Sequence, residues 1–309
     1  MSKYMIRRLL GLIPTLWVII TISFFLIRLA PGGPFDEEKV IPPEIKKSIE
    51  KKYHMDEPLY QQYGRYLYDI CRGDLGPSYR YPDHDVNFYI FTSLPNSMIL
   101  GAISLTMALI LGISTGMISA VKQNTFADYI PMGIAVLGIS IPLFVVGPIL
   151  MYFFAMRWKL LPTSGWIDSQ YGWWTLIMPC TALAFPYFAY IARLSRASIL
   201  ESLRSDYVRT ARAKGLSEGT IMFKHILKGA MLPIASFLGP AFAGIITGSV
   251  VIETIFRIPG LGRFFVVSAF NRDYTLIMGT VVVYSVILIL MNFIVDIVYS
   301  FLDPRITYK

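Results

Sequence analysis

The sequence predicts an all-α integral membrane protein with six transmembrane helices. Of its 309 residues, 55% are hydrophobic and only 16% are charged, whereas about 25% of the residues in an average soluble domain are charged. The mean hydropathy is +0.55. Six stretches without Asp, Glu, Lys or Arg exceed the roughly 18 apolar residues that a spanning helix needs. These stretches are residues 9–27, 86–121, 129–156, 169–192, 229–252 and 274–295.

The first stretch follows Lys3, Arg7 and Arg8, which is the basic start that a signal peptide also has. Its apolar part is longer than the roughly 7 to 15 residues of a signal-peptide core. Arg28 and a Pro-Gly run follow it instead of a small-residue cleavage site, so we expect a retained helix. The second stretch begins with polar residues, which places its membrane part near residues 97–120.

A polar segment at residues 31–95 separates the first two spans. Proline starts two amphipathic patterns in it, one at Pro43 and one at Pro58, which predicts two short helices. Residues 73–79 are rich in turn formers and predict a shaped loop. The expected organisation is an N-terminal tail with the first span (1–30), an external segment (31–95) and a five-helix core (96–309).

Basic residues in the connections predict the orientation, because Lys and Arg are retained on the cytoplasmic side of a membrane. The connection at residues 193–228 carries eight basic and three acidic residues, a net charge of +5. The external segment carries eight basic and eleven acidic residues, a net charge of −3. We therefore expect both termini in the cytoplasm. The total charge of +8 then reflects topology and not nucleic-acid binding, which favours a basic soluble face.

The polar residues argue against an enzyme. The three histidines lie in polar connections without a His-Glu-x-x-His pattern, and neither a Gly-x-Ser-x-Gly turn nor a phosphate-binding loop occurs. The two cysteines, Cys71 and Cys180, predict neither a disulfide framework nor a metal cluster. Arg28, Glu253 and Asp296 lie near the ends of spans, where side chains reach headgroups or water, so we expect structural roles for them.

Glycine and proline within the spans predict close packing and bends. Gly112 with Gly116, and Gly244 with Gly248, have the four-residue spacing that lets helix backbones approach each other. Proline interrupts helical hydrogen bonding and can bend a span. The prolines inside spans are Pro142, Pro148, Pro179, Pro186 and Pro240.

The most specific pattern lies in the connection at residues 196–232. Residues 206–216 read Asp-Tyr-Val-Arg-Thr-Ala-Arg-Ala-Lys-Gly-Leu. Ser205 or Asp206 can start a helix, and Gly215 can adopt the left-handed conformation that ends it. Ser217 can start a second helix toward the fifth span. Composition alone is equally consistent with a plain basic loop that only follows the orientation rule.

This run resembles the cytoplasmic "EAA" loop of binding-protein-dependent ABC importer permeases, and more closely the version in the oligopeptide, dipeptide and nickel permease family. Arg209, Thr210 and Ala211 stand in place of the Glu-Ala-Ala triplet, and the Leu-Pro pair at 232–233 lies further from Gly215 than in the general motif. Four more motifs resemble that family in order. They are residues 7–15 with 28–32, residues 73–78, residues 253–263 and residues 303–305.

The resemblance implies the type I ABC importer permease fold and a non-catalytic permease subunit of an ATP-driven peptide importer in the bacterial cytoplasmic membrane. The implied partners are a second homologous permease subunit in a heterodimer, two cytoplasmic ABC ATPases and an extracytoplasmic peptide-binding protein. No cofactor is expected on this chain, because ATP and magnesium would bind to the ATPases.

The resemblance also implies two sites. The coupling contact with the ATPases falls on Arg209, Thr210, Ala211, Arg212, Ala213, Lys214 and Gly215. The outer gate or the dock for the binding protein falls on Glu253, Pro259, Gly260 and Arg263.

Other functions stay open at this point. Within the family the substrate could be a nickel chelate, glutathione, a sugar or an opine. A secondary carrier or channel would need a repeated half, a pair of broken helices or central charged residues. A membrane-embedded enzyme would need a nucleophile with a base within reach.

Overall fold

The computed structural model describes residues 2–29, 33–34, 43–167 and 169–302. The predicted motif at residues 303–305 and part of the motif at residues 28–32 lie outside this description. The described part of the chain is helical and contains no strand, only an isolated antiparallel bridge between Pro77 and Asp85. The expected all-α architecture is confirmed for these residues.

Five helical stretches of the described residues are long and apolar enough to cross a membrane, and a bent pair of helices makes a sixth if the pair counts as one span. The main helices of the five are α1 (Ser2–Leu29), α4 (Val86–Val121), α7 (Ile177–Leu203), α10 (Leu227–Gly248) and α13 (Tyr274–Leu302). α4 coincides with the second charge-free stretch of the sequence and begins ten residues before residue 96, where the core was expected to start.

The third predicted span is not one straight helix. α5 (Phe126–Ser140) and the helical stretch Leu143–Arg157, whose first part is α6 (Leu143–Leu150), meet at an angle of 112°. Pro142 has no N–H to continue the helix, and Ile141 before it is extended (φ −84°, ψ 123°), as residues before proline prefer. With its 15 residues, α5 is about 22 Å long and shorter than the hydrocarbon core of a bilayer.

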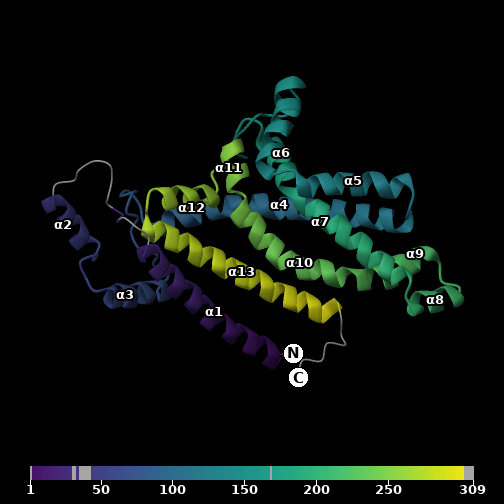
Figure 1. Cartoon of the computed structure of the whole chain (residues 1–309), viewed down its shortest axis with the longest axis horizontal. Helices are drawn as coiled ribbons and strands as arrows, with labels where there is room; N and C mark the ends of the chain where they lie inside the picture. Colours follow the sequence, from purple (N-terminus) through teal and green to yellow (C-terminus); the bar gives the residue numbers. More distant parts are fainter. Residues whose placement is uncertain (1, 30–32, 35–42, 168, 303–309) are drawn as a thin grey trace.

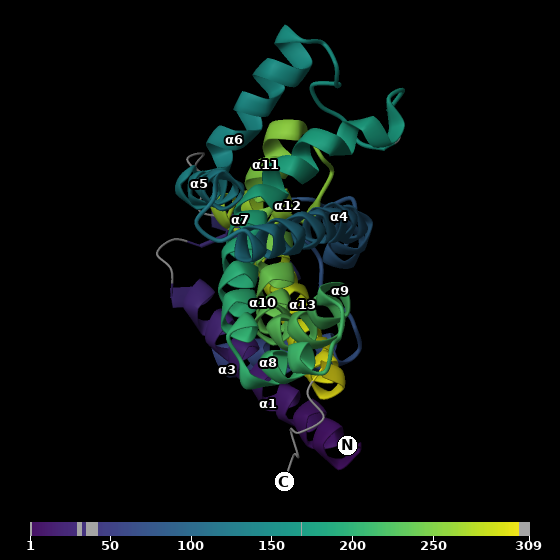
Figure 2. The same cartoon turned by 90° about the vertical axis from the view of Figure 1, so that its right-hand side faces the viewer.

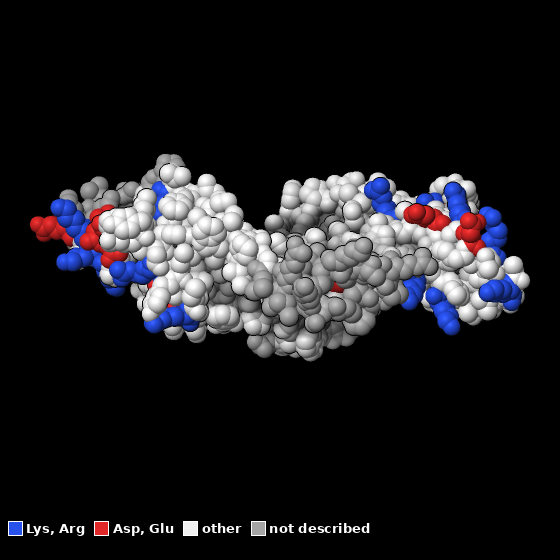
Figure 3. Space-filling model, turned by 90° about the horizontal axis from the view of Figure 1, so that it is seen from below, with Lys and Arg blue, Asp and Glu red and all other residues white. Residues whose placement is uncertain are grey.

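The short helices lie at the two ends of the molecule (Figure 1). α2 (Pro43–Lys52) and α3 (Leu59–Cys71), the two helices that the proline positions predict, lie at one end. α8 (Asp206–Ala213) and α9 (Glu218–Thr220) lie at the other end. α6 projects away from the bundle in both side views (Figure 2). Figure 3 shows the coloured charged side chains gathered mainly at these two ends, and the described surface beside them is mostly uncharged. This distribution is that of a membrane protein.

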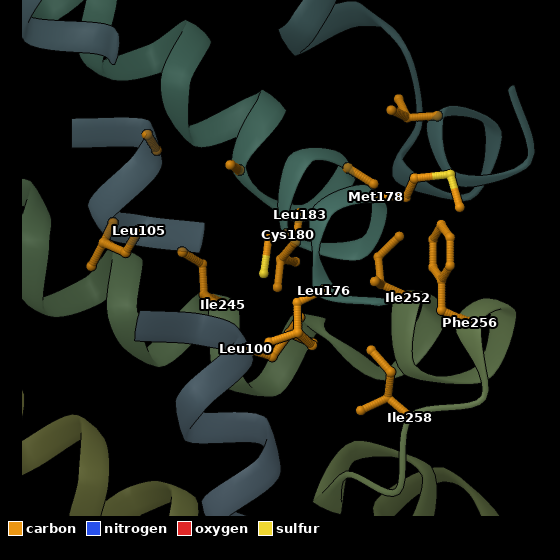
Figure 4. Packing of buried hydrophobic residues seen from close by; sticks show 14 of the residues in the cluster. Leu100, Leu105, Leu176, Met178, Cys180, Leu183, Ile245, Ile252, Phe256 and Ile258 are labelled. Carbon is orange, nitrogen blue, oxygen red and sulfur yellow. The ribbon is translucent and has the colours of Figure 1, made fainter. Parts of the chain in front are cut away.

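A buried apolar cluster joins α4, α7, α10 and α11 (Val250–Phe256) in the centre of the bundle (Figure 4). Leu100 of α4, Leu183 of α7 and Ile245 of α10 are at most 1% exposed. Phe256 extends the cluster into α11 with 1% exposure. α7 is the central helix, because 61% of its apolar window is buried inside the chain, compared with 17% for α13.

Glycine lets α4 and α7 touch along their backbones. A Cβ on Gly112 would lie 2.8 Å from Ile191 Cγ2, and a Cβ on Gly116 would lie 2.6 Å from the carbonyl oxygen of Ala192. Both distances are too short for any side chain. The four-residue glycine spacing in the second span therefore has the packing role that the sequence predicted.

We expect Gly116→Ala to lower the stability of the folded chain, because overpacking at a rigid contact costs about 1–3 kcal/mol. Gly133→Ala is the matched control, since a Cβ on Gly133 of α5 meets nothing within 4 Å. Thermal unfolding of the detergent-solubilised protein should show a lower midpoint for Gly116→Ala only. Equal midpoints for the two variants would contradict the close α4–α7 contact.

Candidate functional site

α8 is a short helix with well-defined ends in the turn between α7 and α10. Its first flanking residue, Ser205, is extended (φ −74°, ψ 154°), and its hydroxyl donates to the carbonyl of Ser202 and does not cap the helix. At the other end, the Gly215 N–H donates to the Arg212 carbonyl and the Leu216 N–H donates to the Ala211 carbonyl. This pair of bonds is a Schellman motif, which terminates the helix.

Gly215 supplies the left-handed backbone that the motif requires, with φ +76°. A Cβ at Gly215 would meet nothing within 4 Å, so the need for glycine is conformational and not steric. Ser217 starts the next helix as predicted, because its side chain accepts a hydrogen bond from the Thr220 N–H. α9, a π-helical turn (Ile221–Ile226) and α10 follow it without a loop.

One face of α8 is buried against the bundle. Val208 is fully buried and Ala211 is 6% exposed. They pack in one cluster with Ile199 of α7 and with Ile221 and Ile226 of the π-helical turn. Ala120 of α4 and Ala230 of α10 complete this cluster. α8 therefore belongs to an apolar cluster that also contains residues of three spans, and it packs directly on the π-helical turn.

The opposite face of α8 is exposed and basic. Arg209, Thr210, Arg212, Ala213 and Lys214 are all exposed. The Arg212 guanidinium donates from Nε and Nη2 to the two carboxylate oxygens of Glu218, at 2.8 and 3.1 Å. The hydrogen bonds that Arg212 donates to the Glu218 carboxylate raise the pKa of Arg212 above its usual value. Arg209 Nη1 lies 3.2 Å from Asp206 Oδ1, in an exposed pair that water and salt weaken.

Seven predicted coupling residues thus lie on one helix and its C-terminal turn, but they do not share a face. Ala211 faces the bundle, whereas Arg209, Thr210, Arg212, Ala213, Lys214 and Gly215 remain exposed. The Lys214 side chain makes no hydrogen bond or ion pair with any described residue, whereas its backbone N–H donates to the Thr210 carbonyl at 3.1 Å. Its ammonium group is available to a partner.

The sequence did not predict an ion pair that joins α5 to α7 near this site. Arg196 donates from Nε to Asp128 Oδ1 and from Nη2 to Asp128 Oδ2, both at 2.6 Å. The Asp128 side chain is 2% exposed and the Arg196 side chain is 27% exposed. Asp128 also accepts the Asn124 N–H at 3.0 Å, which anchors the turn before α5. An acidic residue at a basic span end, which the sequence places on the cytoplasmic side only as an expectation, was the available signal.

At the other end of the bundle, the Glu253 carboxylate is 1% exposed. Its Oε1 accepts hydrogen bonds from Ser97 Oγ of α4 and Ser249 Oγ, both at 2.6 Å. Ser97 Oγ in turn accepts the N–H of Leu261, the first residue of α12 (Leu261–Phe270), at 2.8 Å. Glu253 therefore connects α4, α11 and α12, which is the structural role expected for it.

Two more of the predicted outer-end residues lie beside Glu253. The carbonyl of Pro259 accepts a hydrogen bond from Asn96 Nδ2 at 2.8 Å. Gly260 lies so close to the Glu253 carboxylate that no Cβ would fit between them. Arg263 is separate, since it is exposed and its guanidinium lies over the Phe264 ring at 5.2 Å.

The predicted external loop is fastened to the start of α13 by a buried carboxylate that the sequence analysis missed. Asp273 is fully buried and accepts hydrogen bonds from Ser78 Oγ at 2.5 Å and from the Tyr79 N–H at 3.2 Å. It also accepts the Leu276 N–H, in the manner of a helix N-cap. An aspartate directly before an apolar helix was the signal for this residue.

Among the described residues, no group of three or more His, Cys, Asp or Glu side chains is arranged to bind a metal ion.

Comparison with known proteins gives the same picture over the full chain. Residues 108–308 match the family "Binding-protein-dependent transport system inner membrane component", and residues 1–81 match the N-terminal region of such membrane components. The chain is 48% identical over 308 residues to the oligopeptide transport system permease protein OppB of Salmonella typhimurium, with all of both chains covered. It is 45% identical to the dipeptide transport system permease protein DppB of Bacillus subtilis, with 99% and 98% covered.

The fold also occurs in a solved transporter structure. An inward-facing form of the MetNI methionine ABC transporter has a TM-score of 0.57 with 17% identity, and the match covers 70% of this chain and 97% of the other chain. At this identity the likeness shows the fold alone.

We expect loss of the Asp128–Arg196 pair to destabilise the chain, and Arg196→Gln should cost more than Asp128→Asn. Arg196→Gln leaves a carboxylate buried without a counter-ion, a loss of about 3–5 kcal/mol, whereas the guanidinium in Asp128→Asn can reach water. Thermal unfolding in detergent measures both variants. The exchanged pair Asp128→Arg with Arg196→Asp should recover part of the loss, and equal midpoints for all the variants and the wild type would exclude a structural role.

Proposed function

Because the chain belongs to the family of binding-protein-dependent transport system inner membrane components, we propose that it is one permease subunit of an ATP-driven ABC importer for peptides in the cytoplasmic membrane. We propose peptides as the substrate because the chain is 45–48% identical over its full length to oligopeptide and dipeptide permeases. This identity favours peptides over a nickel chelate or glutathione.

The proposed assembly contains a second, homologous permease, two cytoplasmic ATPases and an external peptide-binding protein. Each permease supplies half of the path. The chain binds no cofactor itself, and the ATPases bind ATP and magnesium. Both termini and α8 lie in the cytoplasm, which the excess of basic residues at residues 193–228 supports.

In the proposed mechanism α8 is the coupling helix. Closure of the ATPase dimer moves α8, and the buried contacts of Val208 and Ala211 transmit this movement to α4, α7 and α10. ATP can shift the equilibrium between inward-open and outward-open states only if it stabilises one of them more than the other. The exposed Arg209, Arg212 and Lys214 are the groups expected to contact ATPase carboxylates or carbonyls.

Purification of the tagged chain from its native membranes tests the assembly. We expect mass spectrometry to identify a second six-span permease and two proteins with phosphate-binding loops. The purified complex should also hydrolyse ATP. Reversal of the charge at Arg209, Arg212 and Lys214 should reduce the recovery of the ATPases, because it places carboxylates opposite carboxylates. Undiminished recovery would refute the basic contact, and recovery of the chain alone would refute the importer.

Gly215→Val should uncouple transport from ATP hydrolysis, because a left-handed backbone costs a β-branched residue roughly 1–2 kcal/mol and loosens the end of α8. Gly215→Asn should retain most of the uptake, since asparagine tolerates this conformation. Gly219→Val is the matched control, because Gly219 has equal space around it without a positive φ. Peptide uptake and ATPase activity in proteoliposomes measure the effect, and unchanged uptake by Gly215→Val would contradict this role.

A further inference from the structure

A pocket of about 530 Å³ lies at the end of the bundle opposite α8. It is enclosed by the end of α1, by α2 and α3, and by the loop at residues 75–79 (Figure 1). The polar side chains that line it include Arg28, Lys52, Gln62, Arg65, Tyr66 and Tyr79. The coupling mechanism uses none of these residues.

Arg28 is a partly buried cation that is positioned without a carboxylate. Its guanidinium lies over the Phe24 ring at 3.5 Å from the centroid, and Phe24 is fully buried. Nε donates to Gln62 Oε1 at 3.2 Å, and Nη1 lies 3.4 Å from the Phe24 carbonyl. No acidic side chain of the described chain forms an ion pair with Arg28. The ring and the amide fix the guanidinium, and no described residue accepts a hydrogen bond from Nη2.

The remaining lining is also suited to an anion. Lys52 and Arg65 add two cations, and Asp69 is the single carboxylate among the lining residues. Arg65 shares its charge with Glu57 at 2.7 Å. Tyr66 Oη is buried and has no hydrogen-bond partner in the described chain. Burial raises the pKa of Tyr79 to about 12 and also raises the pKa of Tyr66, so both hydroxyls keep their protons at neutral pH.

The position of the pocket points to the membrane surface. Arg28 is the second-last residue of α1, and Thr275, which also lines the pocket, is the second residue of α13. α1 also has an apolar, exposed face, with Ile22 at 53% and Leu26 at 61%, on a different side of the helix from Arg28. Because two spans end at the pocket, the pocket lies at the level of the lipid headgroups.

We propose that this pocket binds the phosphate of a phospholipid headgroup, with Arg28 as its main ligand. A guanidinium presents paired N–H donors that match the geometry of a phosphate. Basic pockets between membrane helices are suited to anionic headgroups. The anion would supply the negative charge that Arg28 lacks within the described chain. The proposal does not depend on which solute the transporter carries.

Native mass spectrometry of the detergent-solubilised chain, with the subunits that co-purify with it, tests the proposal. The probe is dihexanoyl phosphatidylglycerol, and dihexanoyl glycerol is the matched ligand without phosphate. We expect one saturable phosphatidylglycerol site, with affinity about tenfold lower in Arg28→Gln. Arg72→Gln removes the same charge from an exposed position directly after α3, outside the pocket lining, and should bind like the wild type.

Loss of binding in Arg28→Gln could also come from a folding defect, so a second variant is needed. Tyr66→Phe removes one hydroxyl from the pocket and keeps the packing. We expect it to weaken phosphatidylglycerol binding and to leave the weak binding of dihexanoyl glycerol unchanged. Equal affinities in the wild type, Arg28→Gln and Tyr66→Phe would overturn the proposal. Full displacement of the lipid by millimolar inorganic phosphate or by a peptide carboxylate would also overturn it, because the pocket would then bind a soluble anion.

Discussion

The burial of Val208 and Ala211 is the interaction on which the rest of the account depends. Without it, α8 would be a basic loop that only follows the orientation rule. With it, an eight-residue helix becomes part of a cluster that includes α4, α7 and α10. In the proposed mechanism, the exposed face of α8 receives a force and the buried face passes it to this cluster. The Schellman motif at Gly215 fixes where the helix ends and the path to α10 begins.

At the far end of the bundle, hydrogen bonds of two buried carboxylates connect the helices and the external loop. Glu253 connects α4, α11 and α12 through Ser97, and Asp273 fastens the external loop to α13 through Ser78. Buried polar groups of this kind specify one arrangement, because a displaced partner would leave a buried carboxylate unsatisfied. In the proposed mechanism, a movement that begins at α8 therefore reaches elements that these hydrogen bonds hold in one arrangement. In contrast, a sharp bend before Pro142 lies between α5 and α6.

Sequence patterns predicted what a short stretch of chain determines by itself. Lipid requires long apolar runs, so the charge-free window at residues 86–121 matches α4 in full. The turn at Gly215 and the helices α2 and α3 follow from local residue preferences. The Asp128–Arg196 and Ser78–Asp273 pairs could not be predicted, because their members are 68 and 195 residues apart and no local pattern joins them. Pro142 predicted a bend, but only tertiary packing sets its angle of 112°.

The most direct test is the distance between α8 and α7 in the working transporter. Spin labels at Thr210 and Arg193, both exposed, would be placed in a variant with Cys71 replaced by Ser, since Cys180 is buried. The assembled complex would be measured by pulsed electron paramagnetic resonance without nucleotide and with trapped ATP. The account predicts one narrow distance distribution that is the same in both states, because α8 and α7 move as one body. A distance that changes or broadens with ATP would contradict rigid coupling through Val208 and Ala211.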